Sequence, residues 1–388
     1  MTPQYSVLLS LIISLLIVSW IHPRLVKIAL MKNLVDVPDS RKLQRRPVPV
    51  LGGIAVFFGI VIGYVSVCGV VNYAGMLIVI MAMMIMLYIG TMDDILSLSP
   101  ALRFMVEFFV ALLLIFNGGY LLDDFHGLWG VGMLPGWVAI PLTVVAAVGI
   151  INAINLIDGV NGLSSGYCIT ACTMFGTLFY LSGDMKMTIL AVVSVGALIP
   201  FFLHNVFGKT SKMFIGDGGT LVMGVVITVF VIETLRSGSA CGAYVGPEVG
   251  LIPFSLAVLC IPVFDTLRVM FSRILRGTSP FRPDKTHLHH MFISLGASHA
   301  ATMLAIVLLN TSVVFCWWAL MEAGASLSVQ LYAVVGMGLL VTFGLYHFLE
   351  WHLQHRTRLL RFMRRLGYRM HLSRTPTFIR IQKFVDRL

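Results

Sequence analysis

The sequence is poor in charge, and this deficit decides the class of protein. Only 11% of its 388 residues are Asp, Glu, Lys or Arg, whereas 58% are hydrophobic. A soluble domain carries about 25% charged residues, so the composition excludes an ordinary water-soluble protein and favours a chain solvated largely by lipid. Acidic residues are fewer than basic ones, with 17 Asp and Glu against 27 Lys and Arg.

Other common features are missing as well. The six cysteines show no paired spacing, which predicts neither a disulfide framework nor a zinc site. The N-terminal apolar run has no basic region before it and no small-residue cleavage site after it, so residues 6–21 are expected to be a retained span. Repeats and low-complexity linkers are also lacking. We therefore expect one polytopic membrane domain over residues 1–350, followed by a tail over residues 351–388.

Long apolar stretches are what the chain has in abundance. Eleven of them are long enough to cross about 30 Å of hydrocarbon as helices, which predicts an all-α integral membrane protein. The expected spans are residues 5–22, 51–71, 73–92, 102–119, 136–153, 166–182, 187–204, 219–235, 250–271, 300–320 and 326–348.

Basic residues give the expected orientation. When the segments between spans alternate sides, all but Lys186 and Arg236 of the 27 Lys and Arg fall on one side. The positive-inside rule makes that side cytoplasmic, with the N-terminus outside and the C-terminus inside a cell (inner) membrane. The tail from Arg356 onwards is basic and amphipathic, which indicates contact with anionic membrane lipid. Topology accounts for the net charge of +10, so no nucleic-acid partner is expected.

Polar side chains gather in four of the expected cytoplasmic connections. The first holds Asp93 and Asp94 at the end of an apolar helix, where acids oppose the helix dipole and so require a cation or a cationic partner. The same dipeptide recurs at Asp123 and Asp124, in an expected outer loop without basic or Asn companions. There we expect solvent-facing side chains.

The second connection carries Asn152, Asn155, Asp158 and Asn161 within residues 150–166. Their spacing of three residues places them on one face of a helical end or a tight turn. Amides and a carboxylate gathered at a membrane boundary indicate a polar binding site.

The third and fourth connections are weaker signals when taken alone. Asp217 lies among glycines just before a helix, where backbone N–H groups favour an anion, although an Asp-Gly turn would explain the pattern equally well. His287, His289 and His290 cluster beside Arg282, and an amphipathic segment at the interface is the structural alternative.

Arg45 and Arg46 end the first cytoplasmic loop, where they could meet a diphosphate or serve only as positive-inside anchors. Carboxylates, amides and basic groups together suit a diphosphate bound to Mg²⁺, or to Mn²⁺ in its place, better than they suit zinc. Because the polar groups gather at one interface, we favour an enzyme over a transporter, whose polar groups belong near the bilayer midplane.

Three acids lie within the expected spans, each with an arginine three or four residues away. Local ion pairs are the simplest explanation, although intramembrane acids are also functional candidates. The expected pairs are Glu107 with Arg103, Glu233 with Arg236, and Asp265 with Arg268.

The four polar motifs together resemble those of the polyprenyl-phosphate N-acetylhexosamine-1-phosphate transferases, which form glycosyltransferase family 4. GTMDDILSLSPALR is similar to that family's Asp-Asp motif and NAINLIDGVNG to its Asn/Asp-Gly motif. MFIGDGGT is similar to its Gly-Asp motif and DKTHLHH to its His motif. The resemblance covers residues 30–300 in motif order, includes the eleven-span topology, and is greatest to the branch that uses UDP-GlcNAc.

This resemblance implies an activity. N-acetylhexosamine-1-phosphate, in the first instance GlcNAc-1-phosphate, would pass from its UDP-sugar to undecaprenyl phosphate with release of UMP. The reaction would take place on the cytoplasmic face with Mg²⁺ as cofactor, as the first lipid-linked step of a cell-envelope glycan. Direct attack of the lipid phosphate on the β-phosphorus is simpler than a covalent intermediate on an Asp.

The resemblance also implies roles for individual residues. The implied catalytic residues are Asp93, Asp94, His287, His289 and His290, and the implied metal ligands are Asp217, Asp94 and Asp158. The implied substrate contacts are Asn152, Asn155, Asp158, Asn161, Arg45, Arg46, Arg282 and Phe214, the last stacking on uracil.

Asn161 departs from the family pattern, because a second acid is usual at that place. An amide can still pair with uracil, so a uridine nucleotide remains the expectation. The alternatives are the same chemistry with UDP-QuiNAc, UDP-FucNAc or UDP-MurNAc-pentapeptide, and, from another class, a secondary transporter or lipid flippase. A homodimer is left open.

Overall fold

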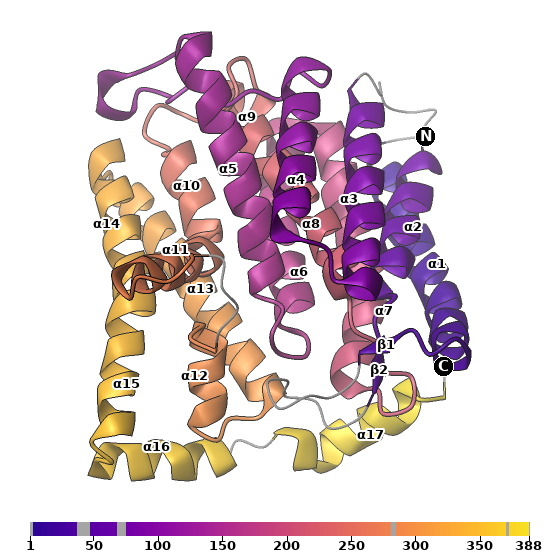
Figure 1. The fold of residues 1–388 in the computed structure, drawn as a ribbon. Coiled ribbons are helices and arrows are strands. Elements are labelled where there is room, and N and C mark those ends of the chain that lie inside the picture. Colours follow the sequence, from indigo (N-terminus) through magenta and orange to yellow (C-terminus); the bar gives the residue numbers. More distant parts are fainter. Residues whose placement is uncertain (1–2, 37–46, 68–74, 281–284, 370–371, 388) are drawn as a thin grey trace.

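The computed structural model describes residues 3–36, 47–67, 75–280, 285–369 and 372–387. In this part of the chain the fold is almost entirely helical, and most of the long helices run side by side in a bundle (Figure 1). The exception is a hairpin of two short antiparallel strands, β1 (Val35–Asp36) and β2 (Val48–Pro49). The expected all-α architecture is confirmed apart from this hairpin.

Seven helical segments of the described residues are long and apolar enough to cross a membrane, so the protein is a multi-pass membrane protein. An eighth candidate is a broken span, in which two helices are bent by 71° at their junction. The seven are α1 (Pro3–Met31), α3 (Met76–Leu96), α5 (Gly136–Leu156), α7 (Met185–Phe207), α8 (Gly216–Leu235), α13 (His299–Glu322) and the continuous run of α14 (Leu327–Leu339), η3 (Leu340–Gly344) and α15 (Leu345–Gln354). The broken span consists of α10 (Leu251–Val258) and α11 (Cys260–Leu275).

The remaining helices are shorter or less apolar. They are α2 (Gly52–Val65), α4 (Pro100–Phe116), η2 (Leu128–Gly130), α6 (Leu163–Ser182), α9 (Ala240–Tyr244), α12 (Leu288–Ser294), α16 (Arg358–Arg369), η4 (Leu372–Arg374) and α17 (Pro376–Val385). Each of the eleven expected spans overlaps a helix, but three of them fall on α2, α4 and α6, which are not among the candidate spans. The structure therefore supports seven or eight spans, while the count of eleven and the orientation remain predictions.

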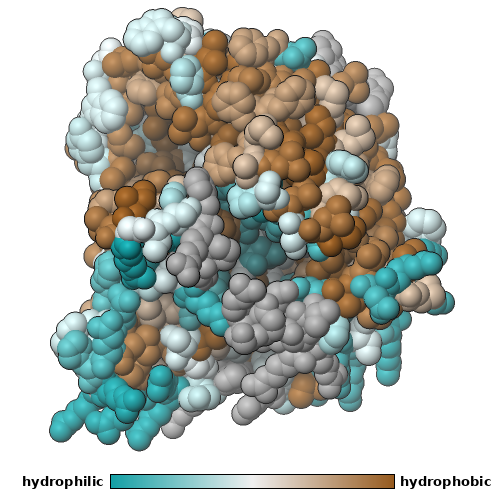
Figure 2. Space-filling model, in the orientation of Figure 1, coloured by the Kyte–Doolittle hydropathy of each residue, from teal (hydrophilic) through white to brown (hydrophobic). Residues whose placement is uncertain are grey.

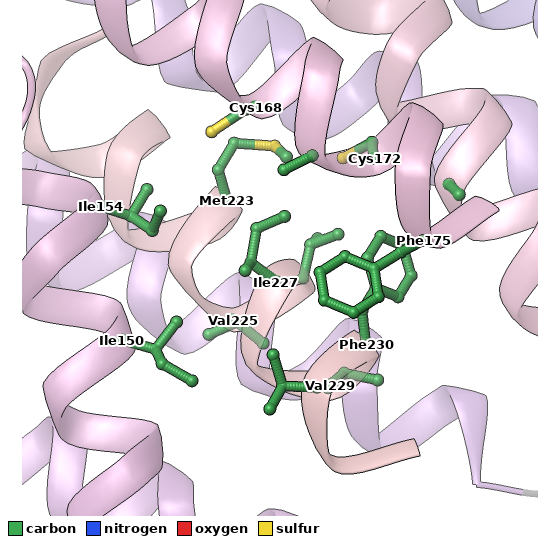
Figure 3. Close-up of a cluster of buried hydrophobic side chains, with 14 of the residues drawn as sticks. Ile150, Ile154, Cys168, Cys172, Phe175, Met223, Val225, Ile227, Val229 and Phe230 are labelled. Carbon is green, nitrogen blue, oxygen red and sulfur yellow. The ribbon is translucent and has the colours of Figure 1, made fainter. Parts of the chain in front are cut away.

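Helix α8 forms the centre of the bundle. All of its residues from Gly218 to Leu235 are buried, whereas most of the apolar side chains on α13 are partly or fully exposed. Figure 3 shows the inner packing, where Met223, Ile227 and Phe230 of α8 lie among Ile150 and Ile154 of α5 and apolar side chains of α6. Because lipid and protein interior are both apolar, hydropathy alone does not distinguish this central helix from a peripheral one.

Glycines allow α8 to approach two neighbouring helices at its N-terminal end. A Cβ on Gly90 of α3 would lie 2.5 Å from the backbone of Gly218, and a Cβ on Gly53 of α2 would lie 2.2 Å from the backbone N of Gly219. Gly53 N–H also donates to the carbonyl oxygen of Ile215 at 2.8 Å. Small residues at helix contacts are typical of membrane bundles.

The ends of the bundle differ in polarity. The C-terminal ends of α3 and α5, the start of α8, and α12 all lie at the lower end in Figure 1, near α16 and α17. Hydrophilic residues gather at this end of the surface, whereas much of the surface above it is hydrophobic (Figure 2). At the opposite end, Asp123 accepts hydrogen bonds from Ser237 N and Oγ at 2.7 and 2.8 Å, so it stabilises a loop and does not simply face solvent as expected.

The variant Gly90→Ala tests the contact between α3 and α8. It is expected to lower the free energy of unfolding by about 1–3 kcal/mol, because the added methyl group overpacks against the backbone of Gly218. Gly336→Ala in α14 is the matched control, since a Cβ there meets nothing within 4 Å and Ala favours a helix. Thermal unfolding of both variants in one detergent provides the measurement, and equal melting temperatures would contradict the close approach.

Candidate functional site

A cavity of about 880 Å³ lies at the polar end of the bundle. Its walls come from the β hairpin, the end of α3, the α5–α6 connection, and the α7–α8 loop (residues 208–215) together with the start of α8. Its polar and aromatic lining includes Asp94, Asn155, Asp158, Asn161, Lys209, Thr210, Lys212, Phe214, Asp217, His290 and His299. Three of the four polar motifs of the sequence therefore line it with acids or amides, and the fourth contributes a histidine.

The carboxylate of Asp94 caps the N-terminus of α8. It accepts hydrogen bonds from the backbone N–H groups of Asp217 at 3.0 Å and Gly218 at 3.4 Å. Gly216 precedes them with a φ of +68°, and a Cβ there would lie 2.4 Å from Asp94 Oδ2. Only a glycine gives the carboxylate this access, and the helix N-terminus provides part of the positive environment that an acid at the end of α3 requires.

Arg103 provides the cationic partner for the acids at this end. Its guanidinium contacts Asp93 Oδ2 at 3.1 Å, Asp217 Oδ2 at 3.3 Å and Glu107 Oε1 at 3.4 Å. The expected pair of Arg103 with Glu107 is confirmed, but the same arginine also joins two acids from α3 and α8. Sequence spacing alone indicated only the local pair with Glu107, although Arg103 lies within the Asp-Asp motif itself.

Two amides of α5 complete this network. Asn155 accepts from Arg103 at 2.8 Å and donates to Asp217 Oδ1 at 2.8 Å. Asn152 accepts from Arg103 at 3.3 Å and donates to the buried carboxylate of Glu107. Asn155 also lines the cavity, whereas in the described residues the lining includes neither Asn152 nor Asp93. Any contact of these two with a substrate therefore stays a prediction.

The other half of the Asn/Asp motif borders the cavity directly. Asp158 and Asn161 both line it, and Asp158 reaches the surface between the walls of the cavity. The backbone N–H of Asn161 donates to His299 Nδ1 at 3.3 Å. Desolvation by the surrounding walls, with a smaller contribution from Asp217, raises the pKa of Asp158 to about 7. A bound cation would favour the charged form of this carboxyl group instead.

The three histidines of the fourth motif have different environments. In the described structure the cavity lining includes His290, while His287 and His289 are buried behind it. Burial, with the neighbouring His290 and His287, holds the pKa of His289 well below its usual value, so this ring is neutral at pH 7. Its Nε2 packs so closely on Gly159 that a Cβ there would lie 2.0 Å away.

The buried acid Asp265 orients His287. Its Oδ2 lies 2.9 Å from His287 Nδ1, while Oδ1 accepts from Arg268 at 2.7 Å. Arg268 is 2% exposed, donates to the carbonyl of Thr286 at 2.6 Å and lies 3.8 Å from the ring centre of Tyr346. The expected pair of Asp265 with Arg268 is confirmed, and it also anchors the His motif.

The third expected ion pair is confirmed as well. Arg236 and Glu233 lie 2.8 Å apart.

Among the described residues of the cavity wall, Phe214 has the largest aromatic side chain. Its backbone is fixed by β2, since its N–H donates to Pro49 O at 2.7 Å, and Lys212 Nζ lies 5.8 Å from its ring centre. Burial lowers the pKa of Lys212 to about 8, so the amine remains mostly charged at pH 7. Sequence reasoning overlooked Lys212 because a lysine in a cytoplasmic loop is already explained by topology.

Three expected substrate contacts, Arg45, Arg46 and Arg282, lie outside the described residues.

The oxygen atoms around the cavity suit a hard cation that is bound by the protein and by a substrate together. Asp94, Asp158 and Asp217 offer carboxylates and Asn155 an amide, all lining one cavity. In the described part of the chain no three His, Cys, Asp or Glu side chains are close enough to hold a metal ion without further ligands. Mg²⁺ in nucleotide sites is commonly bound by one or two carboxylates together with substrate phosphates, and this donor set fits that mode.

The fold and the cavity define a multi-pass membrane protein with an acid- and amide-lined site at one end of its bundle. The profile of "Glycosyl transferase family 4" matches residues 76–235. A "Probable undecaprenyl-phosphate N-acetylglucosaminyl 1-phosphate transferase" of Bacillus subtilis (strain 168) is 31% identical over 309 residues, which cover 78% of this chain and 82% of that protein. The chain belongs to glycosyl transferase family 4.

Two further relatives agree with this assignment. An "Undecaprenyl-phosphate alpha-N-acetylglucosaminyl 1-phosphate transferase" of Escherichia coli O157:H7 is 27% identical over 286 residues, covering 73% of this chain and 75% of the relative. A protein of the same name from Yersinia pestis is 27% identical over 285 residues with the same coverage. The resemblance noted in the motifs is therefore confirmed at the level of the family.

The variant Arg103→Met tests the central cation. It is expected to cost about 3–5 kcal/mol of stability, because it leaves the buried Glu107 carboxylate without its charged partner. Arg236→Met is the matched control at the opposite end. It also leaves a buried acid, Glu233, but among the described residues Arg236 pairs with that one acid whereas Arg103 contacts three, so its removal should cost less. Thermal unfolding measures both, and adding Glu107→Gln should restore part of the loss. A double variant no more stable than Arg103→Met would contradict the role of this pair.

Proposed function

We propose that the protein transfers N-acetylhexosamine-1-phosphate, and specifically GlcNAc-1-phosphate, from the UDP-sugar to undecaprenyl phosphate with release of UMP. The names of the relatives supply this chemistry. The observation that carries it to this chain is that Asp94, Asn155, Asp158 and Asp217, from three separate motifs, line one cavity. Such a product would begin the assembly of a cell-envelope glycan on a lipid carrier.

The nucleotide end of the cavity is assigned to the α7–α8 loop and the α5–α6 connection. Phe214 offers a flat face for the uracil ring, and Asn161 an amide for its polar edge. Lys209 and Lys212 line the same wall and provide positive charge for the diphosphate. Arg45, Arg46 and Arg282 are retained as further diphosphate contacts, on the strength of the sequence alone.

Asp94, Asp158 and Asp217 would hold Mg²⁺, or Mn²⁺ in its place, together with oxygens of the diphosphate. When bound, such an ion offsets the negative charge that develops on the phosphates. Arg103 keeps Asp217 in position from the protein side, since it bonds one carboxylate oxygen while Asn155 bonds the other. The carboxylate is thereby fixed before any substrate arrives.

The transfer step joins an oxygen of the lipid phosphate to the β-phosphorus of the UDP-sugar. The bond from the β-phosphorus to the bridging oxygen breaks, and that oxygen leaves with its electron pair on UMP. Asp94 lines the cavity and is assigned to the metal and the lipid phosphate, while Asp93 supports it through Arg103. His290 is placed to contact the diphosphate or the sugar, with His287 and His289 packed behind it.

We also propose that the chain crosses the membrane as its apolar stretches and basic residues predict. Eleven spans, with the N-terminus outside, would place the polar end of the bundle on the cytoplasmic face. Both substrates could then reach the cavity, the nucleotide sugar from the cytoplasm and the lipid phosphate from the inner leaflet. The two chain termini lie at opposite ends of the bundle in Figure 1, as an odd number of spans requires.

The two Asp-Asp pairs provide a direct test of the site. Asp94→Asn is expected to lower turnover on the order of 100-fold or more, because it removes a charged group at the reacting phosphates. Asp124→Asn is the control and should leave turnover nearly unchanged, since the contacts of the Asp124 carboxylate, with His126 N and His126 Nδ1, lie at the end of the bundle opposite the cavity. The assay follows lipid-extractable label from radiolabelled UDP-GlcNAc with undecaprenyl phosphate and Mg²⁺, and EDTA should abolish it. Equal losses in the two variants would overturn the assignment of the site.

A panel of UDP-sugars tests the sugar specificity. We expect transfer with UDP-GlcNAc to exceed that with UDP-QuiNAc, UDP-FucNAc and UDP-MurNAc-pentapeptide. The reason is that the relatives from Bacillus subtilis and Escherichia coli are both named as N-acetylglucosaminyl 1-phosphate transferases. UMP release measured for each sugar at equal concentration decides among them. Preference for another sugar would correct the substrate and leave the reaction type intact.

Transport remains the competing function, because the break between α10 and α11 is a feature that transporters also show. A transporter or flippase would release no UMP with any sugar of the panel. It would instead move a solute or lipid across proteoliposomes, and that movement would survive Asp94→Asn.

A further inference from the structure

The C-terminal segment of the chain packs against the wall of the cavity. Helix α17 lies beside the end of α7 in Figure 1, and the ring centres of Phe378 and Phe207 are 4.8 Å apart. The family profile ends at residue 235, so this segment lies outside the region that defines the family.

One carboxylate at the end of α17 fixes the α7–α8 loop. Asp386 Oδ1 accepts three successive backbone N–H groups, from Lys209 at 2.9 Å, Thr210 at 3.0 Å and Ser211 at 3.2 Å. It also accepts the hydroxyl of Ser211 at 3.1 Å. Successive N–H groups that converge on one oxygen form an anion-binding nest, and here the anion is part of the same chain.

The loop is held from its other side by two histidines. His204 Nδ1 lies 2.9 Å from Ser211 Oγ, and His22 Nε2 lies 2.8 Å from Ser211 O. The two rings stack with their centres 4.2 Å apart. Ser211 is therefore fixed between the bundle and Asp386, and the position of the loop depends on both.

The same loop forms part of the cavity. Lys209 and Thr210, whose N–H groups bind Asp386, line the cavity, and so do Lys212 and Phe214 further along the loop. A displacement of the nest would therefore move the residues that we assign to the nucleotide.

The other end of the segment packs near the His motif. Leu360 of α16 is buried in a cluster with Met291, which immediately follows the histidines, and with Leu295 at the end of α12. Gly367 of α16 approaches so closely that a Cβ there would lie 2.8 Å from Leu295 O. Residues 358–369 thus contact α12, and residues 372–387 contact the α7–α8 loop.

We propose that the described residues 358–369 and 372–387 form a strap that positions the α7–α8 loop for the nucleotide sugar, with Asp386 as the positioning residue. This inference rests on the proposed function for its consequence, while the contact itself is independent of it. The strap binds no substrate atom. It acts by holding Lys212 and Phe214 in the cavity wall.

The charge of Asp386 supports a lasting contact. Although partial burial opposes ionisation, the N–H groups of Lys209, Ser211 and Thr210 hold the pKa of Asp386 below its usual value. A depressed pKa in the folded state means that the charged form is favoured there, and the stabilisation is lost only as the pH falls through that value. The carboxylate therefore stays ionised and bound throughout the neutral range.

Two readouts on the full-length protein test the strap. In Asp386→Ala, hydrogen exchange of the peptide that covers Lys209, Thr210 and Ser211 should accelerate roughly tenfold or more, because three N–H groups lose a charged acceptor. The KM for the UDP-sugar should rise several-fold, while kcat and the KM for undecaprenyl phosphate stay close to their original values. Glu350→Ala is the matched control, since Glu350 pairs only with His347 at the surface in the contacts described, and it should change neither readout.

Asp386→Asn separates positioning from a general loss of stability. Its amide oxygen can still accept hydrogen bonds, so exchange and KM should fall between those of the original protein and Asp386→Ala, and it replaces Asp386→Ala if that variant fails to fold. Unchanged exchange in either variant would overturn the strap. Faster exchange with an unchanged KM, or an equal loss of kcat in all variants, would overturn the positioning role. If the unmodified protein shows no turnover, the proposed function fails while the exchange measurement still decides the contact.

Discussion

A single arginine allows three acids to meet at the polar end of this bundle. Asp93, Glu107 and Asp217 come from three helices, and without a cation their mutual repulsion and desolvation would oppose the packing of α3, α4 and α8. The guanidinium of Arg103 contacts all three, and its fork of donors suits several oxygens at once. Asn155 then fixes the second oxygen of Asp217, so the acid that faces the cavity has one orientation.

Close backbone contacts make that arrangement possible. The start of α8 lies at the meeting point of α2 and α3, where Gly53, Gly90 and Gly218 remove the side chains that would separate the helices. The same closeness brings Asp94 onto the N–H groups at the start of α8. The chemistry of the site and the packing of the central helix are therefore one structural feature, and a change in either would affect both.

Much of the fold and part of the site were predictable from local sequence. The apolar stretches coincide with helices because a membrane helix needs only length and hydropathy, which are local properties. The acids and amides of three motifs meet at one cavity because helices that alternate in direction return their connections to the same end. The His motif was less predictable: its three residues look alike in sequence, yet only the fold separates His290 in the cavity wall from the buried His287 and His289.

The sequence by itself determined the class of protein, the approximate helices and the end of the bundle at which polar groups gather. Tertiary structure alone decided which helix is central, since lipid and protein interior select the same apolar residues. It also decided the partners: Arg103 and Asp217 are 114 residues apart, and Asp386 and Ser211 are 175 residues apart. Spacing rules reach only three or four residues along a helix, so pairs like these emerge only when the chain has folded.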